Sequence, residues 1–125
     1  MEYNNQETSL PKEVIWKADS YVLGVKVPEY RYELGEKSLV IHSGVLSKKT
    51  EVIPLYTIER MESEVGAISK FFHCGQVKIY LRSRRDTVYV LRVKNPGEVL
   101  DIIARQQLAE KKEFTKRRKN ENRRN

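Results

Sequence analysis

Three side chains in this 125-residue sequence are soft metal ligands: His42, His73 and Cys74. A zinc site needs three or four such ligands at characteristic spacing, and an adjacent pair with one distant histidine fits that poorly. We therefore expect no metal site. Cys74 could act as a nucleophile only beside a positioned base, and adjacency to His73 in sequence does not bring their side chains together. A small buried cysteine is the simpler interpretation.

Other catalytic patterns are missing from the sequence. It has no glycine-rich phosphate loop, no paired carboxylate motif and no serine-centred elbow. We predict that the protein is not an enzyme, with no catalytic residues and no cofactor.

The positive charge is concentrated at the C-terminal end. The chain carries a net charge of +7, from 24 basic and 17 acidic residues. Residues 111–125 hold eight of those basic and two of those acidic residues, which leaves the other 110 with a net charge of +1. Such a tail can lie on an anionic membrane, contact nucleic acid, or only keep the chain soluble.

Basic side chains gather at three places and are our candidate contacts for a partner or an anion. They are Lys48 and Lys49; Arg82, Arg84 and Arg85; and Lys116, Arg117, Arg118 and Lys119. For the first two groups, solvated strands and turns are the plainer interpretation. The loop at 26–31 has two basic residues and one glutamate, too few cations for a lipid phosphate site.

Alternating apolar residues predict seven strands. We place them at residues 21–27, 30–34, 38–42, 45–53, 56–62, 76–82 and 87–93. Residues 63–75 read as a loop or one helical turn with Ile68, Phe71 and Phe72 directed inward. Asn95 and Pro96 predict a helix start, followed by apolar residues at helical spacing.

Seven strands with one apolar face must close into a barrel or pack as two sheets, and the helix can cap them. The fold class is therefore mainly β, a seven-stranded antiparallel barrel or two packed sheets capped by one C-terminal helix. We expect a disordered N-terminal arm at 1–12, a domain at 13–110 with its helix from about residue 96, and a basic tail at 111–125, frayed or disordered.

Several short segments, in order, resemble the bacterial pleckstrin-homology-like domains, the small class often found beside membrane helices. They are Tyr32-Glu33-Leu34, Ser43-Gly44-Val45-Leu46, Ile53-Pro54-Leu55 with Ile58, residues 64–77, and Asn95-Pro96 before Val99. The resemblance spans some 75 positions between about residues 30 and 106. It implies a seven-stranded barrel capped by a helix, without catalytic activity.

The sequence departs from that family at two points. Many members have two membrane-spanning segments ahead of the domain, which this sequence lacks. Residues 72–75, Phe-His-Cys-Gly, stand where a small apolar loop ending in glycine is expected. The resemblance supplies no ligand that could be assigned residue by residue.

We therefore predict a non-enzymatic interaction module that binds a protein partner or docks peripherally on an anionic membrane through its basic tail. One alternative is a nucleic-acid-associated basic protein, for which Tyr80 between Lys78 and Arg82 is suggestive. The other is a scaffold that self-assembles into homo-oligomers through an exposed strand edge or the helix. The polar N-terminus does not look like a signal peptide, and no apolar run reaches about 18 residues. We expect the protein in the cytoplasm or peripheral to the inner face of the membrane.

Overall fold

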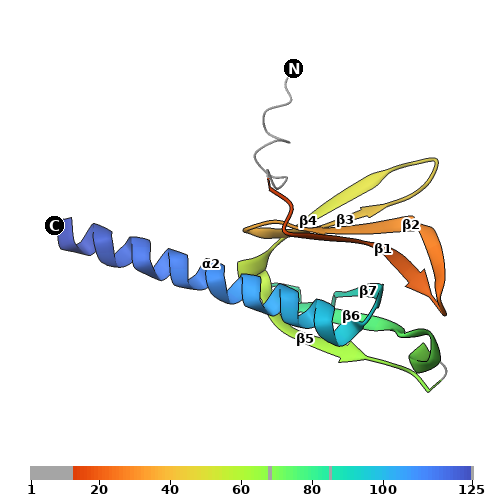
Figure 1. The fold of residues 1–125 in the computed structure, drawn as a ribbon. Coiled ribbons are helices and arrows are strands. Elements are labelled where there is room, and N and C mark those ends of the chain that lie inside the picture. The colour runs from red at the N-terminus through yellow and green to blue at the C-terminus, as the bar shows by residue number, and fades with distance from the viewer. Residues whose placement is uncertain (1–12, 68, 85, 125) are drawn as a thin grey trace.

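The computed structural model describes residues 13–67, 69–84 and 86–124 and has two antiparallel sheets and one long helix (Figure 1). The first sheet contains, in spatial order, β1 (Trp16–Val22), β2 (Val25–Leu34), β3 (Ser38–Ser43) and β4 (Lys49–Pro54). The second contains β5 (Ile58–Glu64), β6 (Cys74–Leu81) and β7 (Val88–Lys94). Short 3-10 helices η1 (Leu55–Thr57) and η2 (Ser69–Phe72) precede β5 and β6, and α2 (Pro96–Arg124) ends the fold. The predicted class is confirmed in its two-sheet form, not as a closed barrel.

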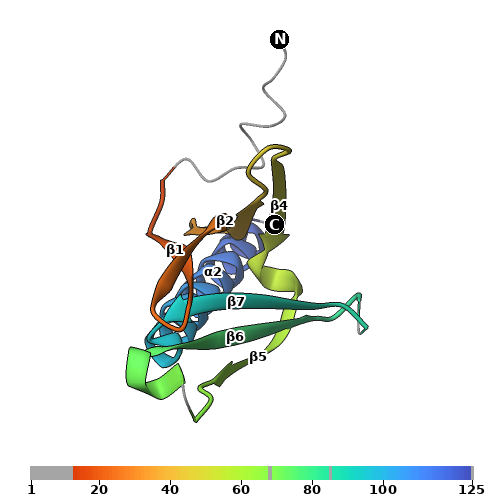
Figure 2. The same cartoon turned by 90° about the vertical axis from the view of Figure 1, so that its right-hand side faces the viewer.

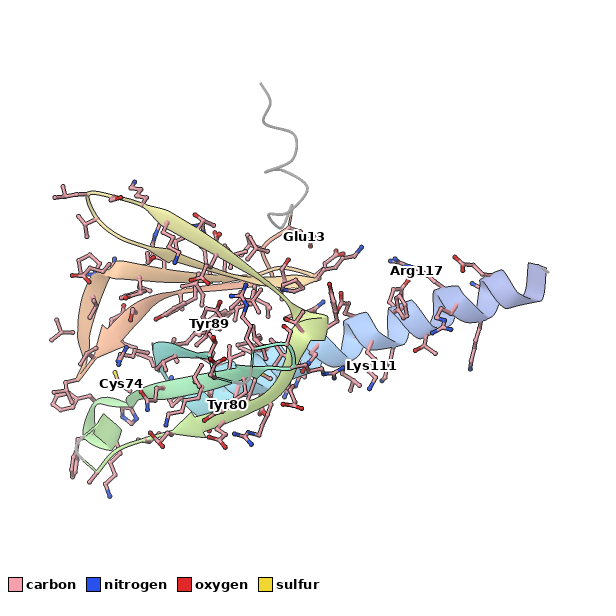
Figure 3. All side chains as sticks on the ribbon, turned by 180° about the vertical axis from the view of Figure 1, so that it is seen from behind. Glu13, Cys74, Tyr80, Tyr89, Lys111 and Arg117 are labelled. Carbon is pink, nitrogen blue, oxygen red and sulfur yellow. The ribbon has the colours of Figure 1, made fainter. Side chains whose placement is uncertain are left out.

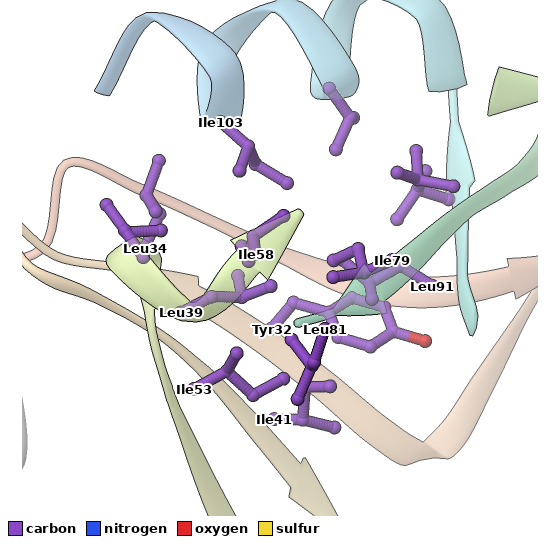
Figure 4. Packing of buried hydrophobic residues seen from close by; sticks show 14 residues of the cluster. Tyr32, Leu34, Leu39, Ile41, Ile53, Ile58, Ile79, Leu81, Leu91 and Ile103 are labelled. Atoms are coloured by element: carbon purple, nitrogen blue, oxygen red, sulfur yellow. The ribbon is translucent and has the colours of Figure 1, made fainter. Parts of the chain in front are cut away.

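The core lies between the sheets and under the first turns of α2 (Figure 4). Along β6 the alternation is as predicted, with Val77, Ile79 and Leu81 buried on one side. Val99 and Ile103 of α2 complete the core. Each fully buried aliphatic side chain contributes about 1.5–3 kcal/mol, so these alternating positions dominate the stability of the fold.

Tyr32 links the two sheets by hydrogen bonds as well as by packing. Its ring is buried in the core, and its hydroxyl donates to Ser20 Oγ of β1 at 3.2 Å. The same oxygen accepts from the Arg92 backbone N–H of β7 at 3.2 Å. A buried hydroxyl with both partners supplied is favourable and holds β1 and β2 against β7.

The first hairpin differs from our prediction of strands at 21–27 and 30–34. β1 begins at Trp16, and the chain turns at Leu23 and Gly24, whose φ angles are +50° and +83°. Two-residue turns with positive φ usually carry Asn-Gly or Asp-Gly, and a Leu-Gly pair does not indicate such a turn. Pro28, which falls between the two predicted strands, lies inside β2. It is tolerated because residues 28–30 fall in a bulge without partners on β1.

β4 begins at Lys49 and not at residue 45 as predicted. The chain turns at Gly44, whose φ is +94°, and then continues as a loop to Lys48. A Cβ atom at Gly44 would lie only 1.9 Å from the Ser47 carbonyl oxygen. Only glycine fits this loop without a shift of the backbone.

The predicted helical turn within 63–75 is confirmed as η2, but the inward orientation of its phenylalanines is wrong. Phe71 is 76% exposed and Phe72 is 45% exposed. The reason is the position of η2, which lies at the end of the sheets, where no further layer of the described residues covers it (Figure 1). Ile68 lies outside the described residues.

α2 begins at Pro96 as predicted but continues to Arg124, through the segment where we expected fraying or disorder. No glycine or proline follows Gly97, and the residues beyond Leu108 are mostly good helix formers. Glu113 and Arg117, four residues apart with 3.9 Å between charged atoms, add a stabilising pair. The expected N-terminal arm at 1–12 lies outside the described residues.

The strained turn leads to a stability prediction. We expect Leu23→Asn to raise the free energy of unfolding by about 0.5–1 kcal/mol, because asparagine tolerates positive φ and leucine does not. Urea denaturation measures the change. Leu23→Ala is the control, since it removes the same apolar group without easing the backbone. A loss of stability in Leu23→Asn would contradict the turn geometry.

Candidate functional site

The last part of α2, residues 111–124, projects beyond the sheets, and we name it the basic extension (Figures 1 and 3). All of its described side chains, at 111–121, are exposed. At 1.5 Å per residue it is about 20 Å long. This part of the chain therefore offers its charges to a partner from several sides.

Three lysines of the basic extension share one face of the helix. Lys112, Lys116 and Lys119 are four and three residues apart, the spacing that aligns side chains along a helix. We name them the lysine stripe, which spans about 10 Å. Within the described part of the chain, no carboxylate lies within 4.0 Å of their ammonium groups.

The predicted cluster at 116–119 is thus divided between two faces. Lys116 and Lys119 belong to the lysine stripe, whereas Arg117 pairs with Glu113 and Arg118 lies 6.0 Å from the centre of the Phe114 ring. Sequence reasoning missed Lys112 as a member of the stripe. Helical spacing would have found it, had the helix been predicted to continue.

Two adjacent glutamines hold α2 where the basic extension begins. Gln106 Nε2 donates to the Glu36 carbonyl, in the turn between β2 and β3, at 3.0 Å. Gln107 Nε2 donates to the carbonyls of Leu55 and Ile58 at 3.1 and 2.9 Å. The helix is therefore tied to both sheets just before it leaves them.

Hollows flank α2 at this point, and Glu110 lines both of them. One, of about 740 Å³, is lined by Tyr56, Leu108 and Phe114 among others. The other, of about 470 Å³, lies toward Ile15. Burial raises the pKa of Glu110, and the positive charge of Lys37 opposes the rise.

The two predicted basic groups on the sheets enclose a carboxylate. Lys48 is exposed in its loop, and Lys49 Nζ lies 3.7 Å from Glu51 Oε1. Tyr89 donates from its hydroxyl to Glu51 Oε2 at 2.6 Å, which is the main reason why the pKa of Tyr89 is raised, with burial second. The nearby Arg84 opposes that rise.

Glu51 therefore neutralises part of the charge that the sequence seemed to concentrate here. Arg82 and Arg84 are exposed, with Arg82 lining the hollow beside Tyr56. Arg85 lies outside the described residues. These strand and turn cations are less suited to an anion than the lysine stripe.

The soft side chains lie apart or are already engaged. His42 Nε2 lies 2.7 Å from Glu33 Oε1, and its Nδ1 lies 3.2 Å from Thr50 Oγ1. Cys74 is buried, with Sγ donating to the Phe72 carbonyl at 3.3 Å. Among residues 13–67, 69–84 and 86–124, no three His, Cys, Asp or Glu side chains are grouped to hold a metal ion.

The sequence model of one family, described as the bacterial PH domain, matches residues 16–107. The chain belongs to the bacterial PH domain family. The match begins at β1 and ends at Gln107, so the family's domain takes in both sheets and the start of α2, and the basic extension lies beyond it. Neither the curated proteins nor the solved structures contain a match to this PH domain.

Domains of this kind are typically non-enzymatic and generally mediate protein or lipid interactions. In the described part of this PH domain, neither α2 nor a shorter helix has an apolar stretch of membrane-spanning length.

The hydrogen bond between Tyr89 of β7 and Glu51 of β4 joins the two sheets and can be tested by mutation. We expect Tyr89→Phe to lower the free energy of unfolding by roughly 1 kcal/mol, since it removes a hydrogen bond to a carboxylate in a half-buried setting. Chemical denaturation measures the loss. Tyr80→Phe is the control, because the Tyr80 hydroxyl bonds to Glu62 in an exposed position. Equal effects of the two variants would contradict a special role for Tyr89.

Glu110 leads to a pH prediction. Its pKa is raised in the folded state, so its contribution to stability is complete below about pH 4.5 and is lost as pH rises through the folded pKa. Glu110→Gln should therefore raise Tm at pH 7 and leave it nearly unchanged at pH 4, as measured by thermal denaturation. A lower Tm at pH 7 would show that the charge of Glu110 is stabilising.

Proposed function

We propose that this PH domain is a non-enzymatic interaction module that docks peripherally on an anionic membrane through its lysine stripe. The observation that supports this most is the alignment of Lys112, Lys116 and Lys119 on one face of an exposed helix, free of carboxylates among the described residues. A straight row of cations fits a flat anionic surface, where all three ammonium groups can approach headgroups together.

The expected strength is that of a reversible attachment. Each lysine near an anionic leaflet contributes about 1 kcal/mol, so the lysine stripe contributes about 3 kcal/mol. Lys111, Arg117 and Arg118 add longer-range attraction from the other faces. Because exposed charges are screened within about 10 Å at 0.1 M salt, binding should weaken steeply with ionic strength.

The nucleic-acid alternative has less support from the sheets. Tyr80, the residue that suggested a stacking platform, has the Arg60 guanidinium 4.1 Å from its ring centre, and its hydroxyl donates to Glu62. Glu64 is a second carboxylate on β5, the strand that carries Glu62. Carboxylates beside a covered ring disfavour a phosphate backbone, so the basic extension would have to bind nucleic acid without this platform.

Self-assembly through the edge of β5 also has little support. β5 is an outer strand of its sheet and carries Glu59, Arg60, Glu62 and Glu64 as exposed residues. Charged side chains on an edge strand discourage pairing with another chain.

Vesicle co-sedimentation tests the proposal. The variant Lys112→Gln/Lys116→Gln/Lys119→Gln removes the lysine stripe while keeping good helix formers. We expect at least tenfold weaker binding to vesicles of phosphatidylcholine with phosphatidylglycerol at low salt. The matched control Lys111→Gln/Arg117→Gln/Arg118→Gln removes the same charge from the other faces and should lose less.

Three outcomes would overturn the proposal. The first is that the full chain does not bind these vesicles at about 50 mM salt. The second is that an oligonucleotide duplex, or an acidic protein such as a polyglutamate-tailed domain, binds tighter than vesicles in the same buffer. The third is an equal loss in the two triple variants, which would show that total charge matters and the stripe does not.

A further inference from the structure

Exposed apolar side chains gather at the end of the domain opposite the basic extension. They come from the turn between β1 and β2 and from the segment around η2, which lie side by side in Figures 1 and 2. We name this set the apolar tip: Val22, Leu23, Val25, Val65, Phe71 and Phe72. Exposed apolar residues are ordinary when scattered, but a contiguous group on a soluble domain marks a contact surface.

The two segments of the apolar tip are packed together. A Cβ atom at Gly24 would lie 3.1 Å from Cδ1 of Phe72, so the turn approaches the ring closely. Residues of both segments also line one shallow hollow of about 240 Å³, including Leu23 and Gly66. The tip is therefore one surface built from two turns and not two unrelated loops.

Leu23 is the residue least explained by folding. It has a φ of +50°, which asparagine or glycine adopts at lower cost, yet its side chain remains 45% exposed. The strain of a bulky residue in this conformation must be offset by a favourable contact, and the partial burial of Leu23 offsets only part of it. Strain at an exposed position is an indication of a binding role.

The shape and charge of the apolar tip favour a lipid bilayer as its binding partner. Its side chains protrude from turns, so a rigid partner would need a matching cavity, whereas the interfacial layer of a bilayer deforms around them. Lys70 lies in the same segment, with Nζ 5.7 Å from the centre of the Phe71 ring. Lys26 follows the first turn, where its Nζ lies 3.4 Å from Asp19 Oδ2. Lysines beside exposed aromatic rings can reach headgroups while the rings enter the apolar layer.

We propose that the apolar tip inserts into the interfacial layer of a bilayer as a second membrane contact. This inference rests on the proposed function, since it adds an apolar anchor to the electrostatic attachment of the lysine stripe. A polybasic segment or a single apolar anchor alone binds membranes weakly, and stable attachment takes both.

The binding test uses a variant that should fold at least as well as the parent. Leu23→Asn/Phe71→Ser replaces two apolar side chains, one at a position that prefers asparagine and one that is mostly exposed. We expect at least tenfold weaker partitioning to phosphatidylcholine–phosphatidylglycerol vesicles, with unchanged urea denaturation or a gain. Val88→Thr, an exposed apolar position at the start of β7, is the matched control and should bind as the parent does.

Insertion itself can be observed by fluorescence. Phe71→Trp adds an indole at the apolar tip, and Trp16 of the parent, partly buried at the start of β1, is the internal reference. Vesicles of brominated phosphatidylcholine with phosphatidylglycerol should quench the Phe71→Trp variant more than the parent. Equal quenching would overturn insertion.

The outcomes separate the two proposals. If the apolar-tip variant binds as the parent does while the lysine-stripe variant fails, the tip proposal is wrong and the proposed function stands. If the tip variant fails while the stripe variant binds normally, attachment through the lysine stripe is wrong, and the apolar tip is the membrane contact and not a second one. If light scattering shows a dimer that Phe71→Ser converts to a monomer, a second copy covers the tip and insertion is overturned.

Discussion

The geometry of this domain depends on how α2 is held against the two sheets. No backbone ladder joins the sheets across the described residues, so packing must close the space between them. Val99 and Ile103 fill that space, and Gln106 and Gln107 then bond to carbonyls on opposite sides of it. The amide groups of two neighbouring residues thus set the direction in which the helix leaves the domain, and with it the position of every charge beyond Leu108.

Much of the fold could be predicted because burial imposes a period on the sequence. β6 alternates cleanly because one face is in the core, and Pro96 marks the helix start because its missing N–H costs nothing there. The first hairpin could not be predicted, since Leu23 and Gly24 do not resemble a turn. Pro28 normally interrupts a strand, but here it lies in a bulge inside β2. Positive φ at a leucine is set by the pairing of the surrounding strands and not by the residue itself.

The functional surfaces were harder to predict for two different reasons. The lysine stripe exists only because the helix continues past its last buried residue. Beyond Leu108 no apolar side chains recur at helical spacing, so the sequence pattern does not predict the helix there. The apolar tip depends on Phe71 and Phe72 having no layer above them, which is a property of the whole fold. Conversely, the sequence favoured Lys49 and Arg84 as anion contacts, but in the structure Glu51 and Tyr89 lie between them.

The uninterrupted course of α2 has a mechanical consequence. Between Gly97 and the end of the helix there is no glycine or proline at which it could bend, and its first turns are part of the core. The sheets and the projecting helix should therefore move as one stiff body over most thermal fluctuations. A ligand held at the far end of α2 would restrict the rotation of the entire domain, and so would determine which sheet surface neighbouring molecules meet.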